Sequence, residues 1–237
     1  MTGGGKSPLY IEITLKLTNL KNMSKFISLK EAASKIKDGM TIMVGGFLAN
    51  GSPETLIDEI VKSGVKNLTL ICNDTAYPDK GVGKMLSNKQ FKKLIVSYIG
   101  ATPEASEWMN RGDIEVEFVP QGTLAERVRA GGTGLGGFLT PTGVGTIVAE
   151  GKQVMTIGGK DYLLELPLHA DVALIGASKA DRSGNLIYNG TSRNFNPIMA
   201  TAADVVIAEP KEIVETGEIS PENVHTPAIL VDYIVEV

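Results

Sequence analysis

The chain has 237 residues, of which 43% are hydrophobic, and its formal net charge is -4. This length and apolar share are typical of one large α/β domain. The acidic balance and the lack of a basic stripe exclude a nucleic-acid-binding surface, because phosphate backbones are bound by clustered Lys and Arg. A single cysteine, Cys72, excludes an internal disulfide framework and fits a reducing compartment, so we expect a cytoplasmic protein.

The first 22 residues differ in pattern from the rest of the chain. Three consecutive glycines, Gly3–Gly5, precede an alternating stretch, and Met23 begins a segment that resembles a second start. We therefore expect 1–22 to be an optional N-terminal extension and 23–237 to be the functional domain. No apolar run reaches the ~20 residues that span a bilayer, which predicts no membrane association.

A regular pattern of elements begins at Ser28. Ser28 and Glu31 form a capping box that predicts a short amphipathic helix. The brief apolar run Thr41–Val44 ends in glycines and is typical of a buried parallel strand. The next helix is predicted to have Ser52 as its N-cap and Pro53 in its first position.

Strands and helices then alternate along the chain. Three apolar runs, each ending at a polar or turn-forming residue, predict strands over Leu68–Cys72, Leu94–Ile99 and Glu115–Val119. A helix is predicted over Leu124–Ala130. Because parallel strands joined by helices form an open doubly wound sheet, ligands are expected at the carboxyl ends of these strands.

The second half of the chain begins with a glycine-rich segment. Gly131–Gly145 is predicted to be a long loop that serves a site. A hairpin with a two-glycine turn and two more buried strands follow, over Val154–Ile157, Tyr162–Leu166, Val172–Ile175 and Val205–Ala208. Together these elements predict an α/β fold, with an open, doubly wound, mostly parallel sheet, helices on both faces, and a small hairpin.

Several familiar types of catalytic or binding motif are rejected, because the spacing or the surrounding sequence does not fit them. The glycines at Gly132, Gly134 and Gly137 have dinucleotide-loop spacing, but a helix precedes them and no helix start follows, so we reject that interpretation. His169, His225 and Cys72 offer no ligand pair at helical or hairpin spacing, and we expect no metal site. No serine lies in a Gly-x-Ser-x-Gly turn. Cys72, at a strand end, is interpreted as a buried small hydrophobe rather than a nucleophile.

The turn after the first long strand is the better candidate for a ligand site. It runs from a strand end through three glycines into a helix, over Gly45, Gly46, Phe47, Leu48, Ala49, Asn50 and Gly51. Small residues let a ligand approach the backbone, and amides near a helix start favour an anionic or carbonyl oxygen. The alternative is a tight turn in which glycine is needed only for packing.

A family resemblance favours the ligand site. Several blocks, which together cover 23–237, resemble the alpha subunits of family I coenzyme A transferases: Asp38–Phe47 with Gly51 and Pro53, Asn73-Asp74, Pro120–Arg127, Ala130–Gly132, Thr140–Gly143 and Arg193–Pro197. The resemblance is strongest to bacterial acetate or butyrate to acetoacetyl-CoA transferases, whose alpha and beta subunits are separate chains.

The resemblance implies a covalent relay in which a glutamate of a Ser-Glu-Asn-Gly-type motif attacks the acyl-CoA thioester. That motif belongs to the beta half of the family and is missing from this sequence, where Glu222-Asn223 is followed by Val224. We therefore expect a CoA-transferase beta subunit as the partner that carries the nucleophile, in a heterodimer or in a heterotetramer of two alpha and two beta subunits.

The remaining roles implied for this chain are binding and support. The segment Gly45–Gly51 is expected to bind CoA as a co-substrate, and no further cofactor is expected. The amides of Asn73 and Gln121 are expected to support catalysis near the thioester carbonyl, with ordinary turn capping as the alternative. Acetoacetyl-CoA, acetyl-CoA or butyryl-CoA and the matching short-chain carboxylates are the expected substrates. Competing hypotheses are a sugar-phosphate isomerase of similar fold and a non-catalytic acyl-CoA-binding module.

Overall fold

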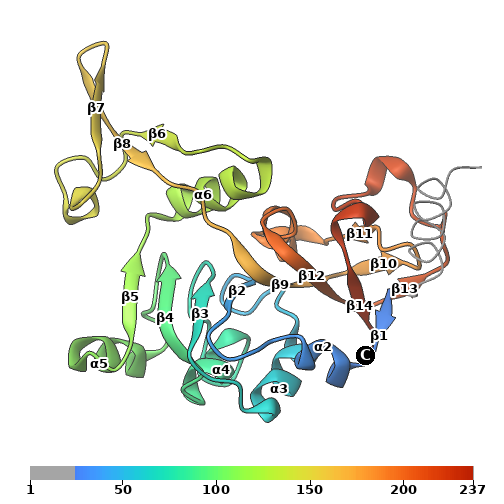
Figure 1. Ribbon diagram of the computed structural model, residues 1–237. Coiled ribbons are helices and arrows are strands. Elements are labelled where there is room, and N and C mark those ends of the chain that lie inside the picture. The colour runs from blue at the N-terminus through green and yellow to red at the C-terminus, as the bar shows by residue number, and fades with distance from the viewer. Residues whose placement is uncertain (1–24, 237) are drawn as a thin grey trace, which may run out of the picture.

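The computed structural model describes residues 25–236, and the predicted extension 1–22 lies outside them. Within the described residues, eight strands form one sheet (Figure 1). In spatial order they are β1 (Phe26–Ile27), β14 (Tyr233–Val235), β12 (Ala203–Pro210), β9 (Ala170–Ala177), β2 (Thr41–Val44), β3 (Leu68–Ile71), β4 (Phe91–Val96) and β5 (Glu115–Phe118). Every neighbouring pair in this sheet is parallel, which confirms the predicted fold class.

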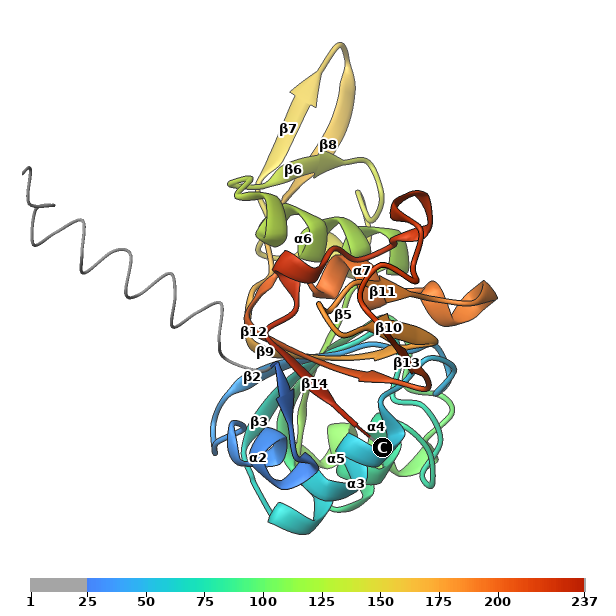
Figure 2. The same ribbon diagram turned by 90° about the vertical axis from the view of Figure 1, so that its right-hand side faces the viewer.

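Helices cover both faces of the sheet (Figure 2). One face carries α2 (Leu29–Ser34), α3 (Glu54–Ser63), α4 (Val82–Ser87) and α5 (Pro103–Arg111); the other carries α6 (Gln121–Thr133) and α7 (Asn196–Met199). Successive strand residues alternate between the two cores, so that Ile42 and Val44 pack with α3 while Met43 packs with α6. This double burial explains why the central strands are continuously apolar in sequence.

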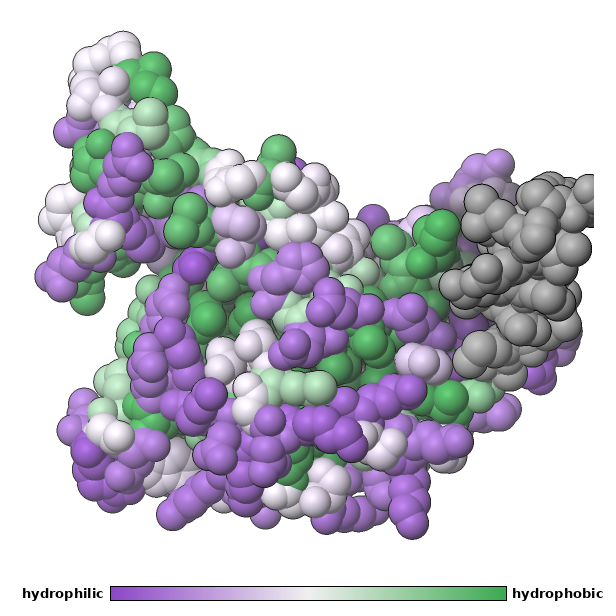
Figure 3. Space-filling model, in the orientation of Figure 1, coloured by the Kyte–Doolittle hydropathy of each residue, from purple (hydrophilic) through white to green (hydrophobic). Residues whose placement is uncertain are grey.

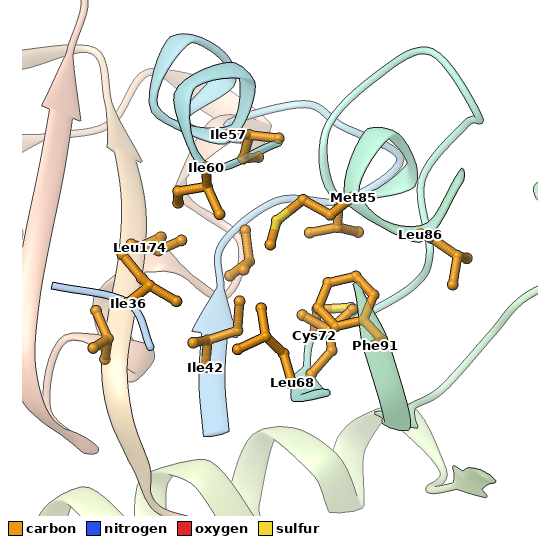
Figure 4. Packing of buried hydrophobic residues seen from close by; sticks show 14 of the residues in the cluster. Ile36, Ile42, Ile57, Ile60, Leu68, Cys72, Met85, Leu86, Phe91 and Leu174 are labelled. Carbon is orange, nitrogen blue, oxygen red and sulfur yellow. The ribbon is translucent and has the colours of Figure 1, made fainter. Parts of the chain in front are cut away.

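The core on the face that carries α2 to α5 is built mainly from branched aliphatic side chains, with Met85, Cys72 and Phe91 among them (Figure 4). Ile57 and Ile60 of α3 and Met85 of α4 pack over Ile42 and Leu68 of the sheet, and all five are fully buried. Each such side chain contributes about 1.5–3 kcal/mol when it is removed from water. These contacts fix the sheet, and with it the loops at the strand ends.

A three-stranded antiparallel sheet projects from the main body (Figure 1). It consists of β6 (Phe138–Thr140), β8 (Lys160–Glu165) and β7 (Val154–Ile157). The predicted hairpin is confirmed, because Gly158 and Gly159 join β7 to β8 with φ of 59° and 77°. The surface of this arm is apolar in part (Figure 3), since Val154 and Ile157 are exposed.

The remaining elements are short. A second small sheet contains β11 (Leu186–Ile187), β10 (Lys179–Asp181) and β13 (Ile213–Val214). Single turns of 3-10 helix lie at Ile147–Ala149, Gly190–Arg193, Pro221–Asn223 and Ala228–Leu230. Among the helices of residues 25–236, none has the length and apolar character needed to cross a membrane.

The predicted N-cap of α3 is wrong. Ser52 does not cap the helix, because its hydroxyl donates to the Gly45 carbonyl, and the residue before the helix is Pro53. The carboxylate of Glu209, at the end of β12, instead accepts from the backbone N–H groups of Thr55 and Leu56, at 3.1 and 2.6 Å. Burial raises the pKa of the Glu209 carboxyl, while these two hydrogen bonds act to lower it. A carboxylate from a distant strand thus serves as the cap.

The predicted loop Gly131–Gly145 is wrong at its start, which belongs to α6, and in its middle, where Phe138–Thr140 forms β6. Helix α6 continues through Thr133, and Gly134 ends it with φ of 71°. A Cβ at Gly131 would lie 2.0 Å from the Leu168 carbonyl oxygen, so glycine is required where the helix packs on neighbouring backbone. Gly132 therefore belongs to the last turn of a helix, not to a turn between a strand and a helix start.

Candidate functional site

A cavity of about 340 Å³ lies at the carboxyl ends of β2, β3, β4 and β5. Four of the residues predicted from sequence line it together: Phe47, Leu48, Asn73 and Gln121. Two of these come from the turn after β2, one follows β3, and one follows β5. The position matches the expectation for ligands in open parallel sheets.

The two predicted amide side chains are in direct contact. The Gln121 Nε2 group donates to Asn73 Oδ1 at 2.6 Å, and Asn73 Nδ2 donates to the carboxylate of Asp74 at 2.6 Å. Asn73 is buried, whereas Gln121 is exposed at the cavity. Because a primary amide has two N–H groups and one oxygen, Gln121 keeps one donor and its carbonyl oxygen for a ligand. Such a donor is suited to a developing oxyanion on a thioester carbonyl.

Asp74 is the residue that organises this edge of the cavity. The residue is only 5% exposed, and its carboxylate also accepts from the backbone N–H of Leu48 at 3.0 and 3.2 Å and from that of Ala76 at 2.7 Å. Leu48, Ala49 and Ala76 have φ of 46°, 69° and 52°, a conformation that residues with a side chain rarely adopt. Asp74 thus holds two strained turns and the Asn73 amide in one arrangement.

The glycines of the turn after β2 face the interior. A Cβ on Gly45 would lie 1.7 Å from Asn196 Oδ1, and one on Gly46 would lie 2.2 Å from Ser52 Oγ. A Cβ on Gly51 would lie 2.6 Å from the Ser192 carbonyl oxygen. The packing role that the sequence left open is therefore present at all three positions.

The exposed part of the turn is its tip. Phe47 and Asn50 exchange two backbone hydrogen bonds, at 2.9 and 3.1 Å, around Leu48 and Ala49. The side chain of Phe47 is 45% exposed and lines the cavity with Leu48. Within residues 25–236, the amides of Ala49 and Gly51 have no hydrogen-bond acceptor.

A loop that is distant in sequence, and contains Asn194 and Asn196, holds the same turn through hydrogen bonds. Asn194 accepts from the Gly46 N–H at 3.1 Å and donates to the Asn50 carbonyl at 2.9 Å. Asn196 donates to the Gly51 carbonyl at 3.1 Å. The late sequence block that contains these asparagines is thus a support for the turn.

Sequence reasoning missed Ser97, Tyr98 and Tyr77, which also line the cavity. Ser97 Oγ donates to the Asn73 carbonyl at 2.7 Å, and both tyrosines are exposed. Ser97 and Tyr98 directly follow β4, so the rule that places ligands at strand ends identifies them once β4 is known to end at Val96.

The other reactive side chains do not line this cavity, although the Cys72 thiol donates to the Asp74 carbonyl at 2.8 Å. Cys72 is buried, and burial raises the pKa of its thiol well above the usual value, so the thiol stays protonated near neutral pH. His225 accepts a hydrogen bond from the Tyr188 N–H through Nδ1. Over the described range 25–236, no group of three His, Cys, Asp or Glu side chains is placed to hold a metal ion.

A family profile and two named relatives match this chain over most of its length. The profile of the coenzyme A transferase family matches residues 26–237. The chain is 52% identical over 212 residues to the acetate CoA-transferase subunit alpha of Escherichia coli K12, a match that covers 90% of this chain and 96% of that protein. It is 53% identical over 213 residues to the acetoacetyl-CoA:acetate/butyrate CoA transferase alpha subunit of Clostridium acetobutylicum, covering 90% and 98%.

Solved structures with a similar fold include two other transferases. An acyl-CoA transferase of E. coli O157:H7, in a thioester complex with CoA, matches with a TM-score of 0.79 at 22% identity over 90% of this chain. The match covers 47% of that protein, so this chain spans about half its length. Glutaconate coenzyme A-transferase of Acidaminococcus fermentans matches with a TM-score of 0.78 at 23% identity, covering 90% of this chain and 75% of that one. These two likenesses show the fold alone.

Proposed function

The chain belongs to the coenzyme A transferase family, and we propose that it is the alpha subunit of a two-chain enzyme that moves CoA between short-chain acyl groups. The substrates in this proposal are acetoacetyl-CoA, acetyl-CoA or butyryl-CoA, paired with acetate, butyrate or acetoacetate. The observation that supports it most directly is the contact between Gln121 and Asn73 in a cavity bordered by the Phe47 turn.

The proposed chemistry needs a nucleophile from the partner subunit. A glutamate carboxylate attacks the thioester carbonyl, CoA leaves as thiolate, and a mixed anhydride remains. The thiolate then attacks the glutamyl carbonyl, which releases the acyl carboxylate and leaves a glutamyl-CoA thioester. An incoming carboxylate reverses these steps. The free N–H of Gln121 stabilises the oxyanion that forms in each attack, and Phe47 and Leu48 hold CoA at the cavity.

The competing hypotheses account for less of the cavity. A sugar-phosphate isomerase needs its own acid or base and a phosphate loop. The polar side chains that line the cavity are two amides, three hydroxyls and the carboxylate of Asp74, whose oxygens already accept internal hydrogen bonds. A non-catalytic acyl-CoA-binding module leaves the paired amides at the strand ends without a role. We therefore favour the transferase, as a cytoplasmic heterodimer or as a heterotetramer of two chains of each kind.

Reconstitution tests the proposal. The purified chain alone is expected to show no CoA transfer, and co-expression with a beta subunit from the neighbouring reading frame is expected to give transfer from acetoacetyl-CoA to acetate or butyrate. Consumption of acetoacetyl-CoA with and without each carboxylate measures the activity, and light scattering gives the stoichiometry. Robust transfer by the single chain, or no transfer by the assembled pair, contradicts the proposal.

Phe47 offers a direct test of CoA binding at the turn. Replacing Phe47 with alanine is expected to raise the KM for acyl-CoA about tenfold with a smaller change in kcat, because an aromatic contact to the bound ligand is lost. A change at Gly46 is less informative, since any side chain there collides with Ser52 whether or not CoA is bound.

Phe118 provides the matched control for Phe47. It is 44% exposed, against 45% for Phe47, and does not line the cavity. The Phe118→Ala enzyme is expected to keep its KM. Equal KM values for the Phe47→Ala enzyme and the unmodified enzyme show that the turn does not bind CoA.

A further inference from the structure

A second cavity, of about 350 Å³, lies at the opposite end of the strands from the first. Asn67, Phe91 and Ile114 line it, and they stand at the amino ends of β3, β4 and β5. The cavity of the proposed transferase site lies at the carboxyl ends of the same strands. The two cavities therefore have no lining residue in common.

Apolar and aromatic side chains form about half of the lining of the second cavity. Leu86 and Phe91 are buried there (Figure 4), Ile114 is buried beside them, and Trp108 of α5 is half-buried. A volume of this size lies at the lower end of the range of ~300–1,000 Å³ typical of small-molecule sites. Four of the eight lining residues are apolar or aromatic, and the other four are polar or charged.

The rim carries positive charge that the protein does not neutralise. Lys89 and Lys92 line the cavity and have no ion-pair partner in the part of the chain from 25 to 236. The one acidic group that lines the cavity, Asp113, is paired with Arg111 at 2.8 Å. The ammonium group of Lys89 lies 5.9 Å from the centre of the Trp108 ring, so the cation and the aromatic ring are neighbours in the cavity lining.

The backbone supplies an independent observation. Five non-glycine residues of the described chain have positive φ, and three of them form the strained turns that Asp74 holds. The other two are Asn67 and Lys89, with φ of 60° and 53°, and both line the second cavity. Lys89 follows the end of α4, a position where glycine is usual and a lysine is strained. Strain of this kind gathers at binding sites.

We propose that this second cavity binds a small aromatic anion, with the ring against Trp108 and the anionic group between Lys89 and Lys92. The ring stacks on the indole, and the two cations supply the charge complement. Neither group alone defines the ligand: the pocket selects a planar ring and a negative charge on one molecule.

Trp108 makes the test specific, because it is the single tryptophan of the sequence. Its fluorescence in the purified full-length chain is followed during titration with ADP, with benzoate and with inorganic phosphate, and free N-acetyltryptophanamide corrects for absorption. Saturable quenching by ADP or by benzoate is expected, and the stronger of the two identifies a nucleotide or an aromatic carboxylate. Inorganic phosphate, which has no ring, is expected to give no saturable change. Linear or absent quenching with both aromatic probes overturns the proposal.

Removing the charges of Lys89 and Lys92 tests whether binding depends on these two lysines or on the overall charge of the protein. The Lys89→Gln/Lys92→Gln double variant is expected to raise the Kd of the quenching probe about tenfold. The control, Lys30→Gln/Lys37→Gln, removes two exposed lysines on or just after α2 and is expected to keep the Kd. CoA transfer by the reconstituted Lys89→Gln/Lys92→Gln enzyme is expected to be unchanged. Equal Kd values in the two double variants overturn the proposal.

Discussion

Replacing Gln121 with alanine is expected to lower kcat for CoA transfer about a hundredfold while the KM for acyl-CoA changes little. Gln121 donates to Asn73 at 2.6 Å, which fixes the direction of its amide before substrate arrives. Loss of one preorganised oxyanion donor typically costs a factor of ~100–1,000 in kcat. Steady-state kinetics of the reconstituted enzyme with acetoacetyl-CoA and acetate measures both constants.

The control for this variant is Gln153→Ala. Gln153 is an exposed glutamine next to β7, outside the cavity, and its truncation is expected to leave kcat unchanged. Thermal unfolding of both variants checks that the fold is intact, because the Gln121 side chain lies on the surface and contributes little to stability. A kcat for Gln121→Ala within twofold of the unmodified enzyme refutes its role in catalysis.

The central strands were predictable because each is buried on both faces and reads as an apolar run, as Thr41–Val44 does. The sequence pattern placed β4 too late in the chain, since Lys92 and Lys93 make its first half look polar. Both lysines lie near the sheet edge, where the partially exposed strand β5 is the last member. The misplaced strand end is the reason that Ser97 and Tyr98 were not identified as cavity residues.

Contacts between distant segments limited the rest of the prediction. Ser52 had the right residue type for an N-cap, but Glu209, more than 150 positions later, accepts the hydrogen bonds of the first amides of α3. The packing of Gly45 against Asn196 is equally invisible in a single sequence, because it depends on how a later loop returns to the first turn. The residue types at the predicted strand ends thus indicated where the cavity lies, while the hydrogen-bond partners of each group required the structure.

Asp74 shows how the structure assigns a role to a residue that the sequence marks only as part of a family block. A carboxylate can only accept hydrogen bonds, so Asn73 must present its NH2 group to Asp74 and its oxygen to Gln121. The direction of the Gln121 amide therefore depends on residue 74 being a carboxylate, which accepts hydrogen bonds and does not donate them. This dependence predicts that stability and catalysis respond differently to two changes at one position.

Asp74→Ala is expected to lower the free energy of unfolding by about 2–4 kcal/mol, because three buried or half-buried N–H groups lose their acceptor. Asp74→Asn keeps one acceptor oxygen and is expected to lose less than about half of that amount. Its kcat is nevertheless expected to fall about tenfold, since an amide no longer enforces the orientation of Asn73 and Gln121. Urea unfolding and steady-state kinetics of the reconstituted enzyme separate the two effects, with exposed Asp79→Ala as the control for both. A kcat for Asp74→Asn equal to that of the control shows that Asp74 supports the fold without orienting the amides.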